Sequence, residues 1–115
     1  MSVKLTTLRV IFTALVMSLF ANVVTAEDMQ GKNIAFDRKK GNCLACHAID
    51  DGVMPGNIGP PLIIMKARFP DRAVLKAQIW DATTENSISI MPPFGKHQIL
   101  SDTDIEKLID YLYTL

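Results

Sequence analysis

The feature that most constrains this chain is the pentapeptide Cys43-Leu44-Ala45-Cys46-His47, which holds both of its cysteines. On a helical turn, two thiols three positions apart face one side, and each can add to one vinyl group of a haem. The imidazole directly after the second cysteine then reaches the haem iron. The spacing therefore predicts one covalent haem c, bonded to Cys43 and Cys46 and ligated by His47, around which the chain has to fold.

Three other uses of the two thiols are weaker. A zinc site needs four ligands, and outside the motif only His97 and carboxylates remain. A disulfide across a two-residue gap in a helical turn is strained. A thioredoxin-like redox pair needs a βαβ context, and no strand pattern precedes the motif. Haem attachment is therefore the interpretation that the motif favours.

The second axial position of the iron calls for another ligand, and we expect it to be Met91 in the string Met91-Pro92-Pro93-Phe94-Gly95. The two prolines stiffen this loop. A thioether ligand favours ferrous iron and raises the reduction potential relative to two imidazoles. Met54 and Met65 are the other methionine candidates, and His97 would give a different ligand chemistry. The alternative for Met91 itself is an ordinary core methionine.

The segment Gly59-Pro60-Pro61-Leu62 follows the motif and has a possible role beside it. A proline carbonyl in this segment can accept a hydrogen bond from the Nδ1–H of His47. Such a bond would fix the orientation and the basicity of the imidazole ring. An ordinary turn is the alternative.

Residues 1–26 have the pattern of a secretory signal peptide. Two basic residues, Lys4 and Arg9, precede an apolar stretch without a charge over residues 10–24. This stretch is short for a bilayer span, which needs about 20 residues. We therefore expect cleavage after about Ala26 and export to a periplasmic compartment, and a retained membrane anchor is the alternative.

The expected mature chain, residues 27–115, is short enough to form one mono-haem domain, and it has no further apolar run that would cross a bilayer. All twelve acidic residues stay in it, whereas two of the twelve basic residues leave with the leader. A weakly acidic chain lacks the excess of basic residues that binds nucleic acid. Domains of this size often need a disulfide, a metal or a cofactor to be stable, and a covalently bonded macrocycle would serve this purpose.

Helix signals predict an all-α domain, because no segment shows the sustained alternation of a strand. A first helix is expected over residues 28–40, with basic residues near its end and Gly41 as its C-terminal cap. Asn42 is expected to cap a short helical turn that carries the motif. A middle helix is expected to begin near Asp71, just after Pro70.

The clearest helix signal lies at the C-terminal end of the chain. Ser101 and Asp104 have the spacing of a capping box, with Asp in place of the preferred Glu. Apolar residues then recur at three- and four-residue steps, which is typical of an amphipathic helix; they are Ile105, Leu108, Ile109, Leu112 and Leu115. Loops are expected between the helices, over residues 50–61 and 83–100.

The order of these motifs resembles class I cytochromes c over the whole mature chain. The resemblance implies a few helices wrapped around one covalently bound haem, with the carbonyl of Pro60 holding the ligand His47. It also implies that the first and last helices cross at right angles, and the candidates for this crossing are Gly31, Phe36 and Tyr111. Residues 37–42 are extra length relative to the pattern of that family.

Four longer strings, residues 35–47, 65–72, 78–82 and 91–95, together resemble the SoxX family, the mono-haem subunit of the sulfur-oxidising SoxAX cytochrome complex. The resemblance implies a heterodimer with a larger haem-bearing subunit, SoxA. It further implies a complex of the L-cysteine S-thiosulfotransferase type, which joins thiosulfate oxidatively to a cysteine of a carrier protein. This chain would take the electrons released and pass them to a downstream cytochrome.

The chemistry of the motif limits that role. Both cysteines are used as thioethers, so no thiol remains to carry a sulfur atom. With Met91 bound, the iron also has no open position for a substrate. We therefore expect a non-catalytic electron-transfer subunit, with the sulfur chemistry on its partner. The alternative is a stand-alone, diffusible periplasmic cytochrome c.

Overall fold

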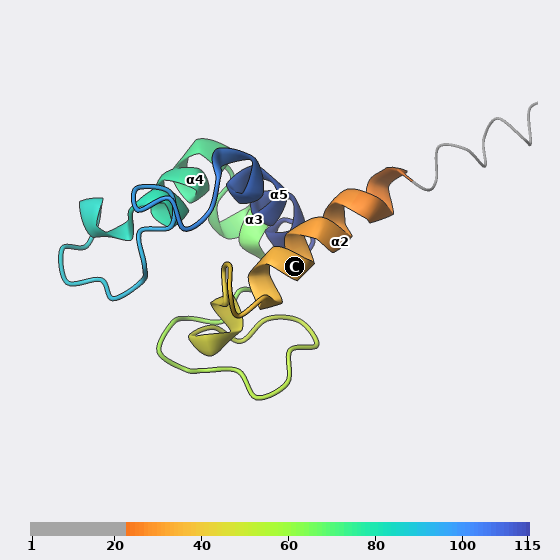
Figure 1. Cartoon of the computed structure of the whole chain (residues 1–115), viewed down its shortest axis with the longest axis horizontal. Helices are drawn as coiled ribbons and strands as arrows, with labels where there is room; N and C mark the ends of the chain where they lie inside the picture. Colours follow the sequence, from red (N-terminus) through yellow and green to blue (C-terminus); the bar gives the residue numbers. More distant parts are fainter. Residues whose placement is uncertain (1–22) are drawn as a thin grey trace, which may run out of the picture.

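The computed structural model describes residues 23–115, so most of the predicted leader lies outside the described residues. The described part contains α-helices, short 3-10 helices and no strand, as expected for an all-α domain (Figure 1). In chain order the elements are α2 (Val23–Phe36), η1 (Cys43–Ala45), α3 (Met65–Arg68), α4 (Arg72–Trp80), η2 (Ala82–Thr84) and α5 (Asp102–Leu112). None of the helices described is long and apolar enough to cross a bilayer.

Helices α2 and α5 cross each other at a point where α2 has no side chain (Figure 1). A Cβ added to Gly31 would collide with the carbonyl oxygen of Lys107 and lie 2.6 Å from Cβ of Tyr111. The two backbones therefore approach each other as closely as glycine allows. This contact confirms the expectation that Gly31 and Tyr111 lie at the crossing of the first and last helices.

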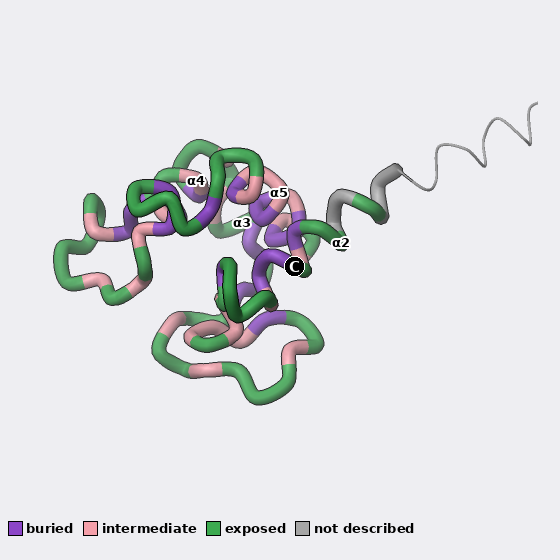
Figure 2. The backbone as a smooth tube through the Cα atoms, viewed as in Figure 1, coloured by how far each residue is buried: buried purple, intermediate pink, exposed green. Residues whose placement is uncertain are grey.

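The core is built on one face of α5, as the apolar stripe predicts. Ile105, Leu108, Ile109 and Leu112 are at most 3% exposed. They pack with Ile34 and Ala35 of α2 and with Leu75 and Ile79 of α4 in one cluster. Figure 2 shows this buried region where the three helices meet, and the two long loops are mostly exposed. Burial of this face supplies the main driving force for folding.

The start of α5 is the predicted capping box. The Ser101 hydroxyl accepts a hydrogen bond from the Asp104 amide at 3.0 Å, and the Asp104 carboxylate accepts one from the Ser101 amide at 3.3 Å. Two otherwise unpaired amides at the helix start are thereby satisfied. Helix α4 also begins where expected, because the Asp71 carboxylate accepts a hydrogen bond from the Ala73 amide at 2.8 Å.

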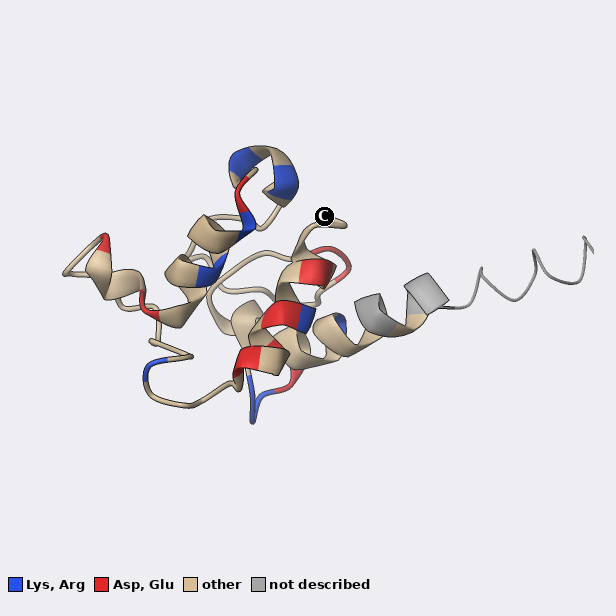
Figure 3. Cartoon of the chain, turned by 90° about the horizontal axis from the view of Figure 1, so that it is seen from above, with Lys and Arg blue, Asp and Glu red and all other residues tan. Residues whose placement is uncertain are grey.

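Ion pairs connect the basic residues of α4 to the acidic residues of α5. Figure 3 colours the basic and acidic positions on the ribbon. Arg72 donates to the Glu106 carboxylate at 2.8 Å and to Asp110 at 2.7 Å. Lys76 lies 2.7 Å from Asp102 and 2.8 Å from Glu106. These contacts set the register between the two helices, although exposed ion pairs add little to stability one by one.

The first helix ends earlier than predicted, at Phe36 instead of Lys40. The Asp37 carboxylate accepts a hydrogen bond from the Lys39 amide at 2.8 Å, and its carbonyl accepts one from the Asn42 amide at 3.0 Å. This local turn competes with helix continuation. The extra length after Phe36 is therefore a turn, and Gly41 does not cap the helix with a positive φ.

Asn42 precedes η1 but does not cap it with its side chain, so that prediction is wrong. Its backbone is left-handed, with φ of 46°, and this conformation turns the chain from the loop into the motif. Asparagine tolerates that conformation better than most residues. The short helix α3 was not expected from the sequence, because four helical residues give too short a pattern to recognise.

Candidate haem-attachment site

The two cysteines of the motif lie on and just after the single turn η1. The amides of Cys46 and His47 both donate to the carbonyl of Cys43, at 3.1 and 2.9 Å. This turn brings the three residues of the motif together over a few positions, as the spacing predicts. Both cysteines are half-buried and unpaired thiols. Before haem attachment, burial raises the pKa of the Cys43 thiol to about 11.

The imidazole of His47 is held by a backbone carbonyl. Its Nδ1 lies 2.7 Å from the carbonyl oxygen of Pro60. A carbonyl only accepts hydrogen bonds, so Nδ1 carries the proton and donates. Nε2 then has its lone pair free for a metal ion, which is the tautomer that an axial ligand needs. The predicted contact between a proline carbonyl and His47 is present, and the proline is Pro60.

The loop after the motif is folded back against it by three backbone hydrogen bonds. The amide of Gly56 donates to Leu44 at 2.9 Å, and that of Gly59 donates to Cys46 at 2.8 Å. The third runs from the Leu62 amide to the Ala48 carbonyl at 2.9 Å. These bonds bring Pro60 back to His47 although the two residues are far apart along the chain.

Two glycines make this close approach possible. A Cβ on Gly59 would collide with the His47 ring, at 2.5 Å from Nδ1 and 2.8 Å from Nε2. A Cβ on Gly56 would collide with the backbone carbonyl of Ala45. The sequence predicts a loop here and a role for the segment that begins at Gly59, but not this close packing of the two glycines. Their position shortly after the motif is the signal that would have indicated it.

The predicted axial ligand Met91 lies in the long loop between η2 and α5. Its side chain is half-buried and packs against the edge of the core, and its amide donates to the Ser89 hydroxyl at 3.3 Å. The other candidates are placed differently. Met65 is 2% exposed inside the core, Met54 is 91% exposed, and His97 is exposed. Met91 is thus the one methionine of these three that lies in a loop and also packs against the core.

The residues of the motif fit a covalently bound haem. Two thiols and a histidine with a free Nε2 lie within one turn of chain, and the backbone of Gly59 packs against the His47 ring, where a side chain would collide with it. Large apolar side chains of the two flanking loops are exposed to water, among them Val53, Ile58, Ile88 and Ile90. Among residues 23–115, no three His, Cys, Asp or Glu side chains converge to hold a bare metal ion.

Class I c-type cytochromes combine an all-α fold, this motif and a histidine that donates a hydrogen bond to a backbone carbonyl. A comparison with protein families agrees: the family described as cytochrome C oxidase, cbb3-type, subunit III matches residues 26–112. The chain belongs to this family. The class I cytochrome c-like fold, electron transfer and covalent haem c are thereby confirmed. The residues that ligate the iron stay predictions.

One curated protein is similar to part of this chain. The chain is 34% identical over 76 residues to an "Uncharacterized lipoprotein" of Aquifex aeolicus (strain VF5). The alignment covers 65% of this chain and 37% of that protein, so this chain spans little more than a third of its relative. The similarity adds no information on substrate or partner.

Proposed function

We propose that this chain is the electron-transferring mono-haem subunit of a thiosulfate-oxidising complex of the SoxAX type. It accepts electrons from the oxidative coupling of thiosulfate to a carrier-protein cysteine and passes them to a downstream cytochrome. The observation that carries the electron-transfer part is the 2.7 Å contact between His47 Nδ1 and the Pro60 carbonyl, next to the two thiols. The complex-specific part is supported by the four strings that resemble the SoxX family.

The bound haem supplies a one-electron couple at its iron. Cys43 and Cys46 would hold it through thioether bonds, and His47 would offer Nε2 to the iron in an orientation that Pro60 fixes. Met91 would supply the second protein ligand, whose thioether favours the ferrous form. Two protein ligands leave no position for a substrate, and neither cysteine is left as a free thiol. The chain therefore moves electrons and leaves the sulfur chemistry to a partner.

Exposed apolar side chains support a permanent partner. Met54 is 91%, Ile88 85%, Val53 79% and Ile90 73% exposed, and all lie on the two loops next to the motif and Met91. Such side chains need a cover in the functional protein, which the haem would supply beside the motif and a binding partner would supply at the loop tips. A larger haem-bearing subunit of the SoxA type is the partner that the sequence resemblance implies.

The axial ligand is tested with a Met91→Ala variant. The oxidised wild-type protein should show a methionine–iron charge-transfer band at the red end of its visible spectrum, and the variant should lose it because the thioether is gone. His97→Ala is the matched control, since His97 is the other ligand candidate in the same part of the chain. The proposal of Met91 as ligand fails if the band persists in Met91→Ala or disappears in His97→Ala.

The partner is tested by purifying the native protein under mild conditions and measuring its size and composition. We expect it to elute with a larger haem-stained chain in one complex. A second sample, in which Val53 and Met54 are both changed to Ser, should elute mostly as the free subunit, because the apolar contact is weakened. A wild-type protein that elutes as a monomer without any larger haem protein would favour the diffusible electron carrier instead.

A further inference from the structure

The loop that carries Met91 is closed at its base by a set of polar contacts. The Lys96 ammonium donates to Asp81 Oδ2 at 2.6 Å. The amides of Gly95 and Lys96 both donate to the carbonyl of Trp80 at 3.2 Å. The end of α4 and the far side of the loop are thereby joined, so residues 82–94 form a closed loop with a narrow base.

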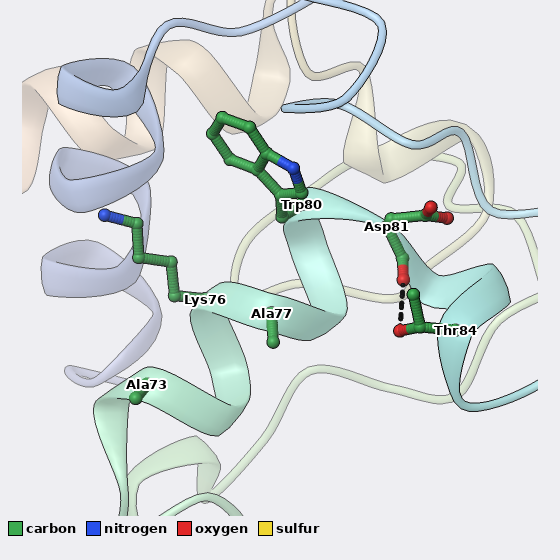
Figure 4. Close-up of a pocket in the computed structure, with 6 residues that line it drawn as sticks. All are labelled: Ala73, Lys76, Ala77, Trp80, Asp81 and Thr84. Atoms are coloured by element: carbon green, nitrogen blue, oxygen red, sulfur yellow. Dashed lines mark hydrogen bonds between the residues drawn. The ribbon is translucent and has the colours of Figure 1, made fainter.

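Asp81 is the centre of this base. It is 4% exposed and is the one buried charged residue in the described part of the chain. Its Oδ1 accepts hydrogen bonds from the amide and the hydroxyl of Thr83. Figure 4 shows the Thr84 hydroxyl on the Asp81 backbone carbonyl, with the Asp81 carboxylate directed away from it. Hydrogen bonds from Lys96 and Thr83 lower the pKa of Asp81 to about 2, so the carboxylate is ionised at neutral pH.

The tip of the loop has no such support. Over residues 86–91, the hydrogen bonds of the described structure stay inside the loop or return to its base at Ala82. Ile88 and Ile90 beside Met91 are 85% and 73% exposed. The position of Met91 therefore depends on its own packing against the core edge and on the closure of the loop at Asp81 and Lys96.

We propose that Asp81 and Lys96 are positioning residues, an ion-pair clasp that keeps the Met91 loop closed and so keeps the Met91 thioether on the haem iron. This inference rests on the proposed ligation by Met91. The clasp acts through the loop, since neither residue is a neighbour of Met91 in sequence and both bind each other at the loop base. Opening the clasp should make the thioether easier to displace.

The test measures how readily imidazole replaces the axial ligand in the oxidised haem protein. Asp81→Asn retains an oxygen for Thr83 but removes the charge that binds Lys96, and Lys96→Met removes the ammonium. Each variant should bind imidazole about tenfold more tightly than the wild type, the change expected when one charge-assisted hydrogen bond is lost. The double variant should match the single ones, because either change opens the same clasp.

Lys66→Met is the matched control, since Lys66 is exposed on α3 and forms no ion pair in the described part of the chain. It should bind imidazole as the wild type does, and Lys96→Arg should restore most of the wild-type behaviour because it retains the charge. Imidazole affinities of Asp81→Asn and Lys96→Met within twofold of the wild type would overturn the clasp.

Hydrogen exchange of the peptide over residues 85–92 separates this inference from the ligation on which it rests. Faster exchange in Asp81→Asn and Lys96→Met, with wild-type exchange in Lys66→Met and in the helices, shows a loop opened by loss of the clasp. Unchanged exchange in the loop overturns the clasp even where Met91 is the ligand. The separate spectrum of Met91→Ala decides the ligation, so the two failures are distinguishable.

Discussion

At the scale of single residues, Gly31 sets how closely the two crossing helices approach. The missing Cβ leaves room for the carbonyl of Lys107 and the Cβ of Tyr111, and a backbone carbonyl cannot turn aside as a flexible side chain can. An added methyl group would therefore push α2 and α5 apart along their whole contact. Close packing of this kind tolerates little extra volume.

Gly31→Ala should therefore lower the free energy of unfolding, although alanine favours a helix over glycine by about 1 kcal/mol. We expect a net loss of about 1–3 kcal/mol from overpacking at the crossing. Urea denaturation of the haem protein measures it. Gln30→Ala, at the exposed neighbouring position of α2, is the control and should stay within about 0.5 kcal/mol of the wild type. Equal or greater stability of Gly31→Ala would show that the helices have room to separate.

Several site residues were predictable because their chemistry depends on local spacing. The turn with Cys43, Cys46 and His47 follows from the pentapeptide, and the carbonyl contact with Pro60 follows from the resemblance to class I cytochromes c. The contacts of Asp81 were not predictable. A single aspartate after a helix looks like any exposed charge, and its partner Lys96 comes from the far side of a loop.

At the scale of elements, prediction succeeded where a strong pattern and a local cap coincide. Helix α5 has its predicted apolar face and its capping box, and α4 starts at its predicted cap, Asp71. The end of α2 was misjudged because the basic residues after Phe36 favour a helix C-terminus, whereas the Asp37 side chain forms a turn first.

The short helix α3 shows a second limit of sequence patterns. It follows Ile64, whose φ is 46°, a conformation that β-branched residues rarely adopt. Tertiary contacts hold it there. The Met65 amide donates to the last carbonyl of the chain at 3.2 Å, and the Arg68 guanidinium donates to the Pro61 carbonyl at 2.8 Å. The first contact joins segments that are far apart in the sequence and the second lies outside the helix itself, so local propensity does not predict this element.

At the scale of the whole molecule, three helices form the hydrophobic core and two loops hold the side chains expected to contact the haem. Helices α2, α4 and α5 bury the core (Figure 2). The loop after the motif, which contains Pro60, and the Met91 loop project from these helices (Figure 1). Each loop is tied down by a few specific hydrogen bonds, at Pro60 in one and at Asp81 in the other. Domains of this size often need a bound group or a covalent link for stability.

We expect one haem bonded through Cys43 and Cys46, and the intact mass of the purified protein tests this expectation most directly. The mass should exceed that of the processed polypeptide by one haem, and the addition should survive denaturation because thioether bonds are covalent. Changing both cysteines to Ala should remove it. A wild-type protein with the mass of the bare polypeptide, colourless after export in a host that attaches haem c, would contradict the haem site.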